Sequence, residues 1–215
     1  MVQKNSVVSV LKILRKSISK KSMLEGKRTK ETKFQILIST ILSARARDSV
    51  TIPLSEKLFK SYPDAKSLAA AKKRDVEKLI KRIGFYKNKA KNVINTSKII
   101  HNKFKDRVPE SKQDLLSLPG VGSKVANCVL VYAFSKDAIP VDTHVHKVSN
   151  RLGWVKTNNP KQTEKILEKI VPRKYWSWVN ELFVLHGQDV CKSIPLCSKC
   201  AIFKYCKRIG VRKSR

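Results

Sequence analysis

Hydrophobic residues recur at helical spacing along most of the chain. Near its start, apolar residues separated by lysine and arginine form one face: Val7, Val10, Leu11, Leu14 and Ile18. This pattern predicts an amphipathic helix, followed by a polar stretch over residues 19–30. Residues 34–42 are too apolar for a surface helix and predict a buried one that closes near Ser43.

Proline and glycine separate the later helical patterns, for example at Pro63 and Gly84. The expected helices cover residues 49–62, 69–83, 88–104, 111–118, 123–134, 142–152 and a stretch around 166–171. No segment alternates apolar and polar residues with the period of two that a half-buried strand shows. The predicted fold class is therefore all-α, with short connections between helices.

The charge changes this picture of an ordinary helical protein. The 215 residues include 47 Lys and Arg against 16 Asp and Glu, a formal net charge of +31. Nucleic acid is the commonest intracellular polyanion, and clustered cations gain affinity for its phosphates through counterion release. DNA or RNA is thus the first expected partner, and a basic surface that serves only solubility is the alternative.

No segment is expected to enter a membrane. The longest unbroken apolar run, residues 128–134, is far shorter than the about 20 residues that a spanning helix needs. Lys12, Arg15 and Lys16 interrupt or follow the apolar residues near the N-terminus, and no small-residue cleavage site follows. We therefore expect an intracellular protein without a targeting signal.

The segment LPGVGSK at residues 118–124 predicts a sharp turn between two helices. The exposed N–H groups of the second helix could hold a phosphate, although an ordinary helix–loop–helix turn would look the same. Lys124 falls in the first turn, where the helix dipole disfavours an ammonium group. A partly neutral amine there would be a nucleophile able to form a Schiff base, and a solvated surface lysine is the alternative.

Asp142 stands at the expected start of another helix, in the segment PVDTHVHK. Aspartate is a favoured N-cap, and capping alone would explain its presence. A carboxylate near an amine nucleophile could also accept a proton or stabilise positive charge on a sugar. Both interpretations stay open on the sequence.

Four cysteines lie within sixteen residues in the order C-x5-C-x2-C-x5-C: Cys191, Cys197, Cys200 and Cys206. Disulfides are not expected inside a cell, so the thiolates point to a metal centre. A zinc site of four cysteines usually has two C-x2-C pairs, and only one is present, so a [4Fe-4S] cluster fits better than zinc. Cys128 lies in an apolar helical run and is expected in the core.

Taken together, these segments resemble the endonuclease III family of helix-hairpin-helix DNA glycosylases. The resemblance rests on LPGVGSKVANCVL, PVDTHVHKVSNR and HGQDVC with three further cysteines, and also on GFYKNKAKNV and LSARARD in the same order. It covers about residues 31–206. It implies two helical lobes, one over residues 30–139 with the hairpin, the other from residues 1–29 and 140–215 with the [4Fe-4S] cluster.

The resemblance also implies an activity and a partner. The family flips a damaged nucleotide out of double-stranded DNA into a cleft between the lobes. Lys124 matches the nucleophile that attacks C1′ of the deoxyribose, and Asp142 matches the catalytic carboxylate. The Schiff base then permits β-elimination at an abasic site. Gly120, Val121 and Gly122 match the phosphate-gripping hairpin. Oxidised pyrimidines are the implied substrates, and a monomer is expected.

By the same resemblance, residues near Arg45 fill the gap left by the flipped nucleotide and Phe85 wedges into the opposite strand, while lysines of the loop at residues 192–199 contact DNA. Several positions depart from the family pattern. Arg45 and Arg47 stand where glutamine and threonine are usual, which leaves the contact with the orphan base open. The other departures are Ser123 for arginine, Val125 for threonine, Gln188 for arginine, and a first cysteine spacing one residue shorter than usual.

Two alternatives remain. A monofunctional mismatch glycosylase would use water as its nucleophile, but such relatives generally lack a lysine at the position of Lys124, and the adenine enzymes carry a glutamate where this chain has Thr40. A non-enzymatic DNA-binding protein could keep the hairpin, but the presence of both Lys124 and Asp142 argues against it.

Overall fold

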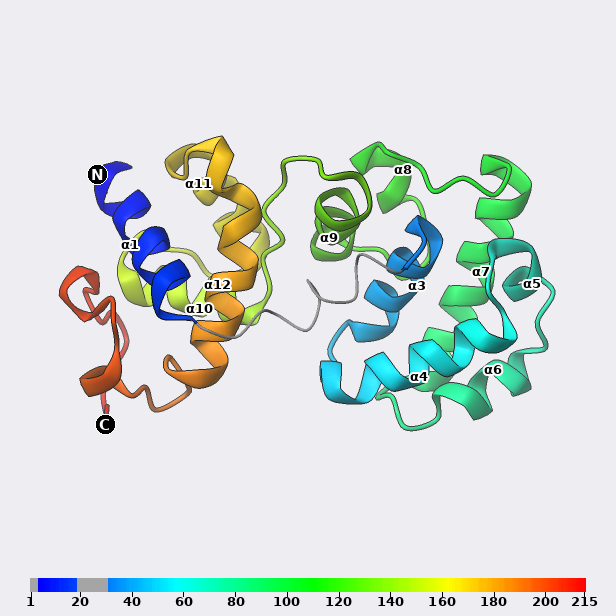
Figure 1. Cartoon of the computed structure of the whole chain (residues 1–215), viewed down its shortest axis with the longest axis horizontal. Coiled ribbons are helices and arrows are strands. Elements are labelled where there is room, and N and C mark those ends of the chain that lie inside the picture. Colours follow the sequence, from blue (N-terminus) through cyan, green and yellow to red (C-terminus); the bar gives the residue numbers. More distant parts are fainter. Residues whose placement is uncertain (1–3, 19–30) are drawn as a thin grey trace. The chain divides into compact units, whose positions relative to one another are not determined.

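The computed structural model describes residues 4–18 and 31–215, and its regular elements there are all helices (Figure 1). The all-α prediction is confirmed. The chain forms two compact units, one from Met1–Ser22 with Asp137–Arg215 and the other from Met23–Lys136. We call them the cysteine unit and the hairpin unit.

The hairpin unit is built around a buried helix. Its helices are α3 (Lys33–Ser43), α4 (Asp48–Ser61), α5 (Ala65–Ala69), α6 (Lys73–Ile80), α7 (Tyr86–Phe104), α8 (Lys112–Leu116) and α9 (Ser123–Phe134). Helix α3 packs against α4, α7 and α9, and a capping box between Thr32 and Gln35 starts it. Its apolar sequence is explained by this central position, as expected from residues 34–42.

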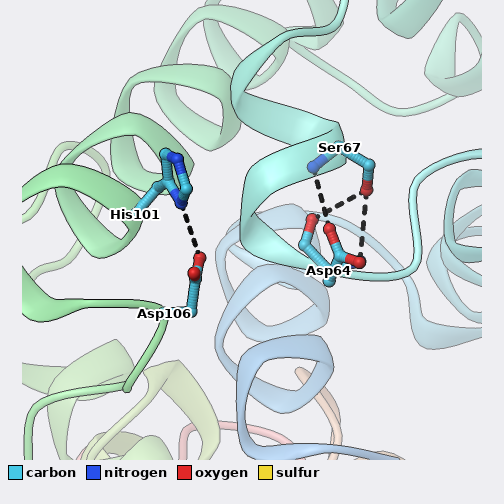
Figure 2. Close-up of polar contacts among 4 residues, drawn as sticks. All are labelled: Asp64, Ser67, His101 and Asp106. Atoms are coloured by element: carbon cyan, nitrogen blue, oxygen red, sulfur yellow. Dashed lines mark hydrogen bonds and ion pairs between the residues drawn. The ribbon is translucent and has the colours of Figure 1, made fainter.

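Helix α5 packs against α7 within this unit. Figure 2 shows its capping box, in which the Asp64 carboxylate accepts a hydrogen bond from the Ser67 amide at 2.8 Å. This bond and the Ser67 hydroxyl lower the pKa of Asp64 below its ordinary value. Nearby, at the end of α7, His101 Nδ1 lies 2.9 Å from Asp106 Oδ1. The first contact thus lies at the start of α5 and the second at the end of α7.

The predicted helix over residues 69–83 is wrong in its extent. Instead α5 ends at Ala69 and α6 covers Lys73–Ile80. The cap at Asp64, directly after Pro63, starts α5 before the range expected from the apolar pattern. The chain then turns through residues 70–72 before α6 begins, so the predicted range corresponds to α6 with both ends extended, and α5 lies almost entirely outside it.

The cysteine unit combines the first helix with the last third of the chain. It contains α1 (Lys4–Ser17), α10 (Thr143–Leu152), α11 (Pro160–Ile170), α12 (Trp176–Asp189) and short 3-10 turns at Arg173–Tyr175, Cys197–Lys199 and Phe203–Tyr205. Helix α12 packs against α1 and α10, with Phe183 fully buried. The hydrophobic pattern of the sequence did not predict α12, because the apolar residues of this helix surround it and leave little amphipathic signal.

No helix in the described ranges 4–18 and 31–215 is long and apolar enough to span a membrane.

Candidate functional site

A helical hairpin places the glycine-rich segment between α8 and α9. Gly120 has φ +80°, and a Cβ there would lie 3.0 Å from Nδ2 of Asn92 and 3.1 Å from Cγ2 of Ile41. A larger residue would therefore be strained and crowded. Gly122 differs, because a Cβ on it would meet nothing within 4 Å. Space is thus open where α9 begins.

Helix α7 anchors the hairpin by a hydrogen bond. The Thr96 hydroxyl donates a 2.9 Å hydrogen bond to the Pro119 carbonyl, and the Val121 amide donates to the Leu118 carbonyl at 3.1 Å. Leu118 and Val121 are buried, whereas Gly120 and Gly122 are exposed. The turn therefore has a fixed inner side and presents its glycines outward.

Lys124 is the second residue of α9 and is half-buried. Gly122 is the N-cap and supplies no side-chain hydrogen bond. Residues 125–130 of α9 are all buried, so the helix is enclosed on every side beyond its first turn. The predicted position of Lys124 in the first turn, directly after the hairpin, is confirmed.

Asp142 is the N-cap of α10 and half-buried. Its Oδ1 atom accepts hydrogen bonds from the amides of His144 at 2.9 Å and Val145 at 2.8 Å. The segment before it is anchored too, since Asn180 Nδ2 donates to the Pro140 carbonyl at 2.8 Å. The capping role of Asp142 is confirmed. Lys124 and Asp142 belong to different units of the chain.

Arg45 and Phe85, the two residues expected to enter the duplex, share an unusual backbone. Their φ angles are +55° and +60°, in the left-handed region that non-glycine residues rarely occupy. Both side chains are exposed, and that of Phe85 is 71% exposed, which is rare for a large apolar ring. Each therefore stands at a tight turn with its side chain available for contact.

The four cysteines of the C-terminal loop line one pocket of the cysteine unit: Cys191, Cys197, Cys200 and Cys206. Apolar residues such as Leu152 and Ile202 line it as well. Among residues 4–18 and 31–215, no three His, Cys, Asp or Glu side chains converge closely enough to hold a single metal ion. The sulfur atoms instead surround a shared space. Cys128 is buried in the hairpin unit, as predicted.

Arg151, which was not predicted as a site residue from the sequence, holds this loop in place. Its guanidinium donates to the carbonyls of Lys192 at 2.6 Å and Ser193 at 3.0 Å, and to Cys191 Sγ at 3.3 Å. Burial raises the pKa of the Cys200 thiol, and the neighbouring cysteines add to this. Nearby positive charge is therefore needed to stabilise the thiolate form. The sequence offered one indication that Arg151 is a site residue, namely its position at the end of the motif PVDTHVHKVSNR.

Three more residues near the Asp142 cap or the cysteines are buried or tightly packed: His186, Lys147 and His144. Burial lowers the pKa of His186 to about 4, so its ring is neutral at pH 7, and Nε2 lies 3.8 Å from Cys200 Sγ. Burial also lowers the pKa of Lys147 on α10. His144 packs tightly on α12, where a Cβ at Gly187 would lie 2.5 Å from its Nδ1. A side chain at Gly187, the glycine in HGQDVC, would therefore clash with the His144 ring.

A family model described as "HhH-GPD superfamily base excision DNA repair protein" matches residues 38–173. The chain is 47% identical over 175 residues to endonuclease III of Thermotoga maritima, which covers 81% of this chain and 82% of that protein. The chain belongs to the endonuclease III family. A second member, the endonuclease III homolog of Encephalitozoon cuniculi, is 32% identical over 220 residues and covers 95% of this chain and 90% of its own.

Solved structures agree with this endonuclease III assignment. A trapped covalent intermediate of an endonuclease III with DNA matches with a TM-score of 0.88 and 31% identity, over 97% of both chains. A thermostable thymine-DNA glycosylase matches with a TM-score of 0.83 and 26% identity, over 95% of both chains. The family resemblance inferred from the motifs is confirmed.

Proposed function

We propose that this endonuclease III family protein is a bifunctional DNA glycosylase and AP lyase of base excision repair that removes oxidised pyrimidines from duplex DNA. The observation that carries the proposal is Lys124 in the first turn of α9, directly after the glycine hairpin, in a chain 47% identical to an endonuclease III. An amine in this place is suited to covalent catalysis.

In this mechanism the Lys124 amine attacks C1′ of the deoxyribose. The N-glycosidic bond breaks, and the base leaves with the bonding electrons and takes up a proton. The amine then loses a proton, and the C1′–O4′ bond breaks with O4′ taking the bonding electrons and a proton, which opens the sugar ring and gives a protonated Schiff base. This cation acidifies the C2′ proton, and its removal expels the 3′ phosphate and cuts the strand. Water then hydrolyses the imine and restores Lys124.

Asp142 is the proposed catalytic carboxylate. Its two hydrogen bonds to backbone amides both use Oδ1, so the group is held in one orientation while it caps α10. A carboxylate held in this way can accept the proton that the amine loses and stabilise positive charge on the sugar. Capping and catalysis are therefore compatible roles for one side chain.

The remaining residues bind and deform the DNA. The turn at Gly120, Val121 and Gly122, in which the two glycines are exposed, presents the start of α9, which has no side-chain cap, to a backbone phosphate. Arg45 fills the space left by the flipped nucleotide, and Phe85 enters between bases of the opposite strand. Both have exposed side chains, and arginine can stack on a base as well as donate hydrogen bonds. The +31 charge supplies affinity for any duplex.

The four loop cysteines would hold a [4Fe-4S] cluster. Four sulfur donors around one pocket with apolar walls, and with Arg151 beside Cys191, fit such a group. When bound, the cluster supplies a covalent framework for the loop at residues 192–199 and no step of the sugar chemistry. Replacing Cys197 by serine should remove the visible absorbance of the cluster, and metal analysis that finds zinc in place of iron would overturn the assignment.

Borohydride trapping tests the central proposal. The protein is mixed with a duplex that carries one thymine glycol, borohydride is added, and a covalent protein–DNA band is sought. Lys124→Ala should abolish the band, whereas Lys98→Ala, at an exposed site on α7, should retain it. A band that persists in Lys124→Ala would assign the nucleophile elsewhere.

A monofunctional mismatch glycosylase is the second candidate, favoured by the match to a thymine-DNA glycosylase at 26% identity. It would release a mismatched base without any trapped band, and alkali would then cut the abasic strand. If neither trapping nor base release occurs with any lesion or mismatch, a binding-only protein is left. We expect the protein to act inside the cell as a monomer.

A further inference from the structure

Lys89 in the hairpin unit is a buried lysine. Its exposed fraction is 6%, and Nζ donates a 2.8 Å hydrogen bond to the carbonyl of Leu42. Burial lowers the pKa of Lys89, which reflects the cost of placing an ammonium group away from water. A lysine in such a place needs a specific favourable interaction.

The interaction joins the ends of two helices. Leu42 lies in the last turn of α3, where carbonyl groups lack partners within the helix and the helix dipole is negative. Lys89 lies in the first turn of α7, whose positive end disfavours an ammonium. The carbonyl end of α3 offsets this, so the charge of Lys89 is satisfied by α3 and not by its own helix.

Both proposed wedge residues lie next to this contact. Arg45 follows Leu42 by three residues, in the turn that ends α3. Phe85 is the N-cap of α7, and its carbonyl accepts a 3.0 Å hydrogen bond from the Lys89 amide. One residue thus contacts the last turn of α3, just before Arg45, through its side chain, and Phe85 through its backbone.

We propose that Lys89 is a positioning residue that holds Arg45 and Phe85 at a fixed separation, so that both side chains enter a duplex at one lesion. The inference rests on the proposed function, because it needs a flipped nucleotide and a gap to fill. It assigns Lys89 no contact with DNA. A left-handed turn is costly for a non-glycine residue and persists where neighbouring contacts fix it. The Lys89 bond fixes the end of α3, from which the Arg45 turn starts.

A second anchor on the same face of α7 serves as a matched control. Thr96 lies seven residues after Lys89, which is about two turns, and its hydroxyl binds the Pro119 carbonyl of the hairpin. Lys89 therefore anchors a wedge turn, and Thr96 anchors the phosphate-binding turn. Removing either bond should weaken a different part of DNA recognition.

Equilibrium binding to two duplexes separates these roles. One duplex is undamaged, and the other carries a tetrahydrofuran abasic analogue opposite 2-aminopurine, whose fluorescence rises when it is unstacked. Lys89→Met should lower the preference for the tetrahydrofuran duplex about tenfold, with undamaged affinity changed less than about twofold, because one charged hydrogen bond is lost. The 2-aminopurine signal should fall with it. Thr96→Val should weaken both duplexes equally.

The loss of preference for the tetrahydrofuran duplex in Lys89→Met should also depend on Arg45 and Phe85. When Arg45 and Phe85 are both alanine, adding Lys89→Met should change the preference less than about twofold, because the residues act as one unit. Lys91→Met, at an exposed site on α7, controls for loss of charge. If Lys89→Met does not fold, Lys89→Gln replaces it, since its amide is one atom too short to make the same bond.

The outcomes separate failure of this inference from failure of the proposed function. Borohydride trapping on a single-stranded abasic oligonucleotide needs no wedge and should be unchanged in Lys89→Met. A wild-type protein that neither traps nor prefers the tetrahydrofuran duplex would refute the proposed function. A wild-type protein that does both, with Lys89→Met retaining the preference and the fluorescence, would refute the positioning role.

Discussion

Helices α9 and α10 begin with nearly the same backbone conformation, but only α10 has a side chain that caps its first turn. Their N-caps, Gly122 and Asp142, have φ and ψ of −97° and −179°, and of −101° and −170°. The caps are twenty residues apart, and a valine precedes each. At α10 the Asp142 carboxylate caps the first amides, whereas at α9 the cap has no side chain.

The difference assigns each helix start a different partner. The positive end of α10 is satisfied within the protein by its own carboxylate. At Gly122 the space for a side chain is open, so the start of α9 suits an external anion such as a DNA phosphate. The second helical residue differs as well, since Lys124 and His144 occupy equivalent positions.

The largest effect is expected from Asp142→Asn, which keeps the cap and removes the charge. Asparagine caps helices about as well as aspartate, so the free energy of unfolding should change by less than about 0.5 kcal/mol. The single-turnover rate of base release should fall on the order of 10²–10⁴-fold, as for loss of a general base. An unchanged rate would leave Asp142 with capping alone. Asp142→Ala, which loses the cap too, is the stability control.

A smaller effect is expected from Gly120→Ala, which disturbs the approach to α9. The φ of +80° and the contacts with Asn92 and Ile41 make a methyl group strained there. The free energy of unfolding should fall by about 1–3 kcal/mol, as measured by urea denaturation. Gly122→Ala, at a site with open space, should cost much less. Equal costs at the two glycines would contradict this account of the turn.

A smaller effect still is expected from Gly122→Asp, which makes the start of α9 resemble that of α10. A carboxylate cap in place of glycine should raise the free energy of unfolding by a few tenths of a kcal/mol. Its charge should repel the phosphate and weaken binding of undamaged duplex about tenfold, as seen by fluorescence anisotropy. Gly122→Asn, a neutral cap, should lose less affinity. Tighter binding by the aspartate variant would exclude a phosphate at this position.

Local sequence signals predicted most of the helices, the start of α9 and the cap of α10. The start of α9 at Ser123 and the cap at Asp142 follow from glycine and aspartate at helix boundaries. The same signals missed α12, because a helix that is apolar on most sides has no clear periodicity. They also missed α5, which has only five residues, and extended α6 beyond both of its ends.

The supporting contacts of the candidate site could not be predicted in this way. Lys89 reaches a carbonyl 47 residues earlier, and Arg151 reaches carbonyls more than 40 residues later. Such pairs depend on which helix ends meet in space, and nothing in the local pattern around either residue records this. Lys89 is one of many lysines in this chain, and nothing in the sequence around it indicated that it is buried.

Lys124 and Asp142 belong to separate compact units, each with its own hydrophobic core. Domains of this kind can lose their structure at different temperatures, so one melting temperature need not describe the whole chain. Because catalysis needs both residues, heating removes activity as soon as the weaker unit unfolds. Thermal inactivation of this protein would therefore measure the stability of one half, and calorimetry would be needed to find that of the other.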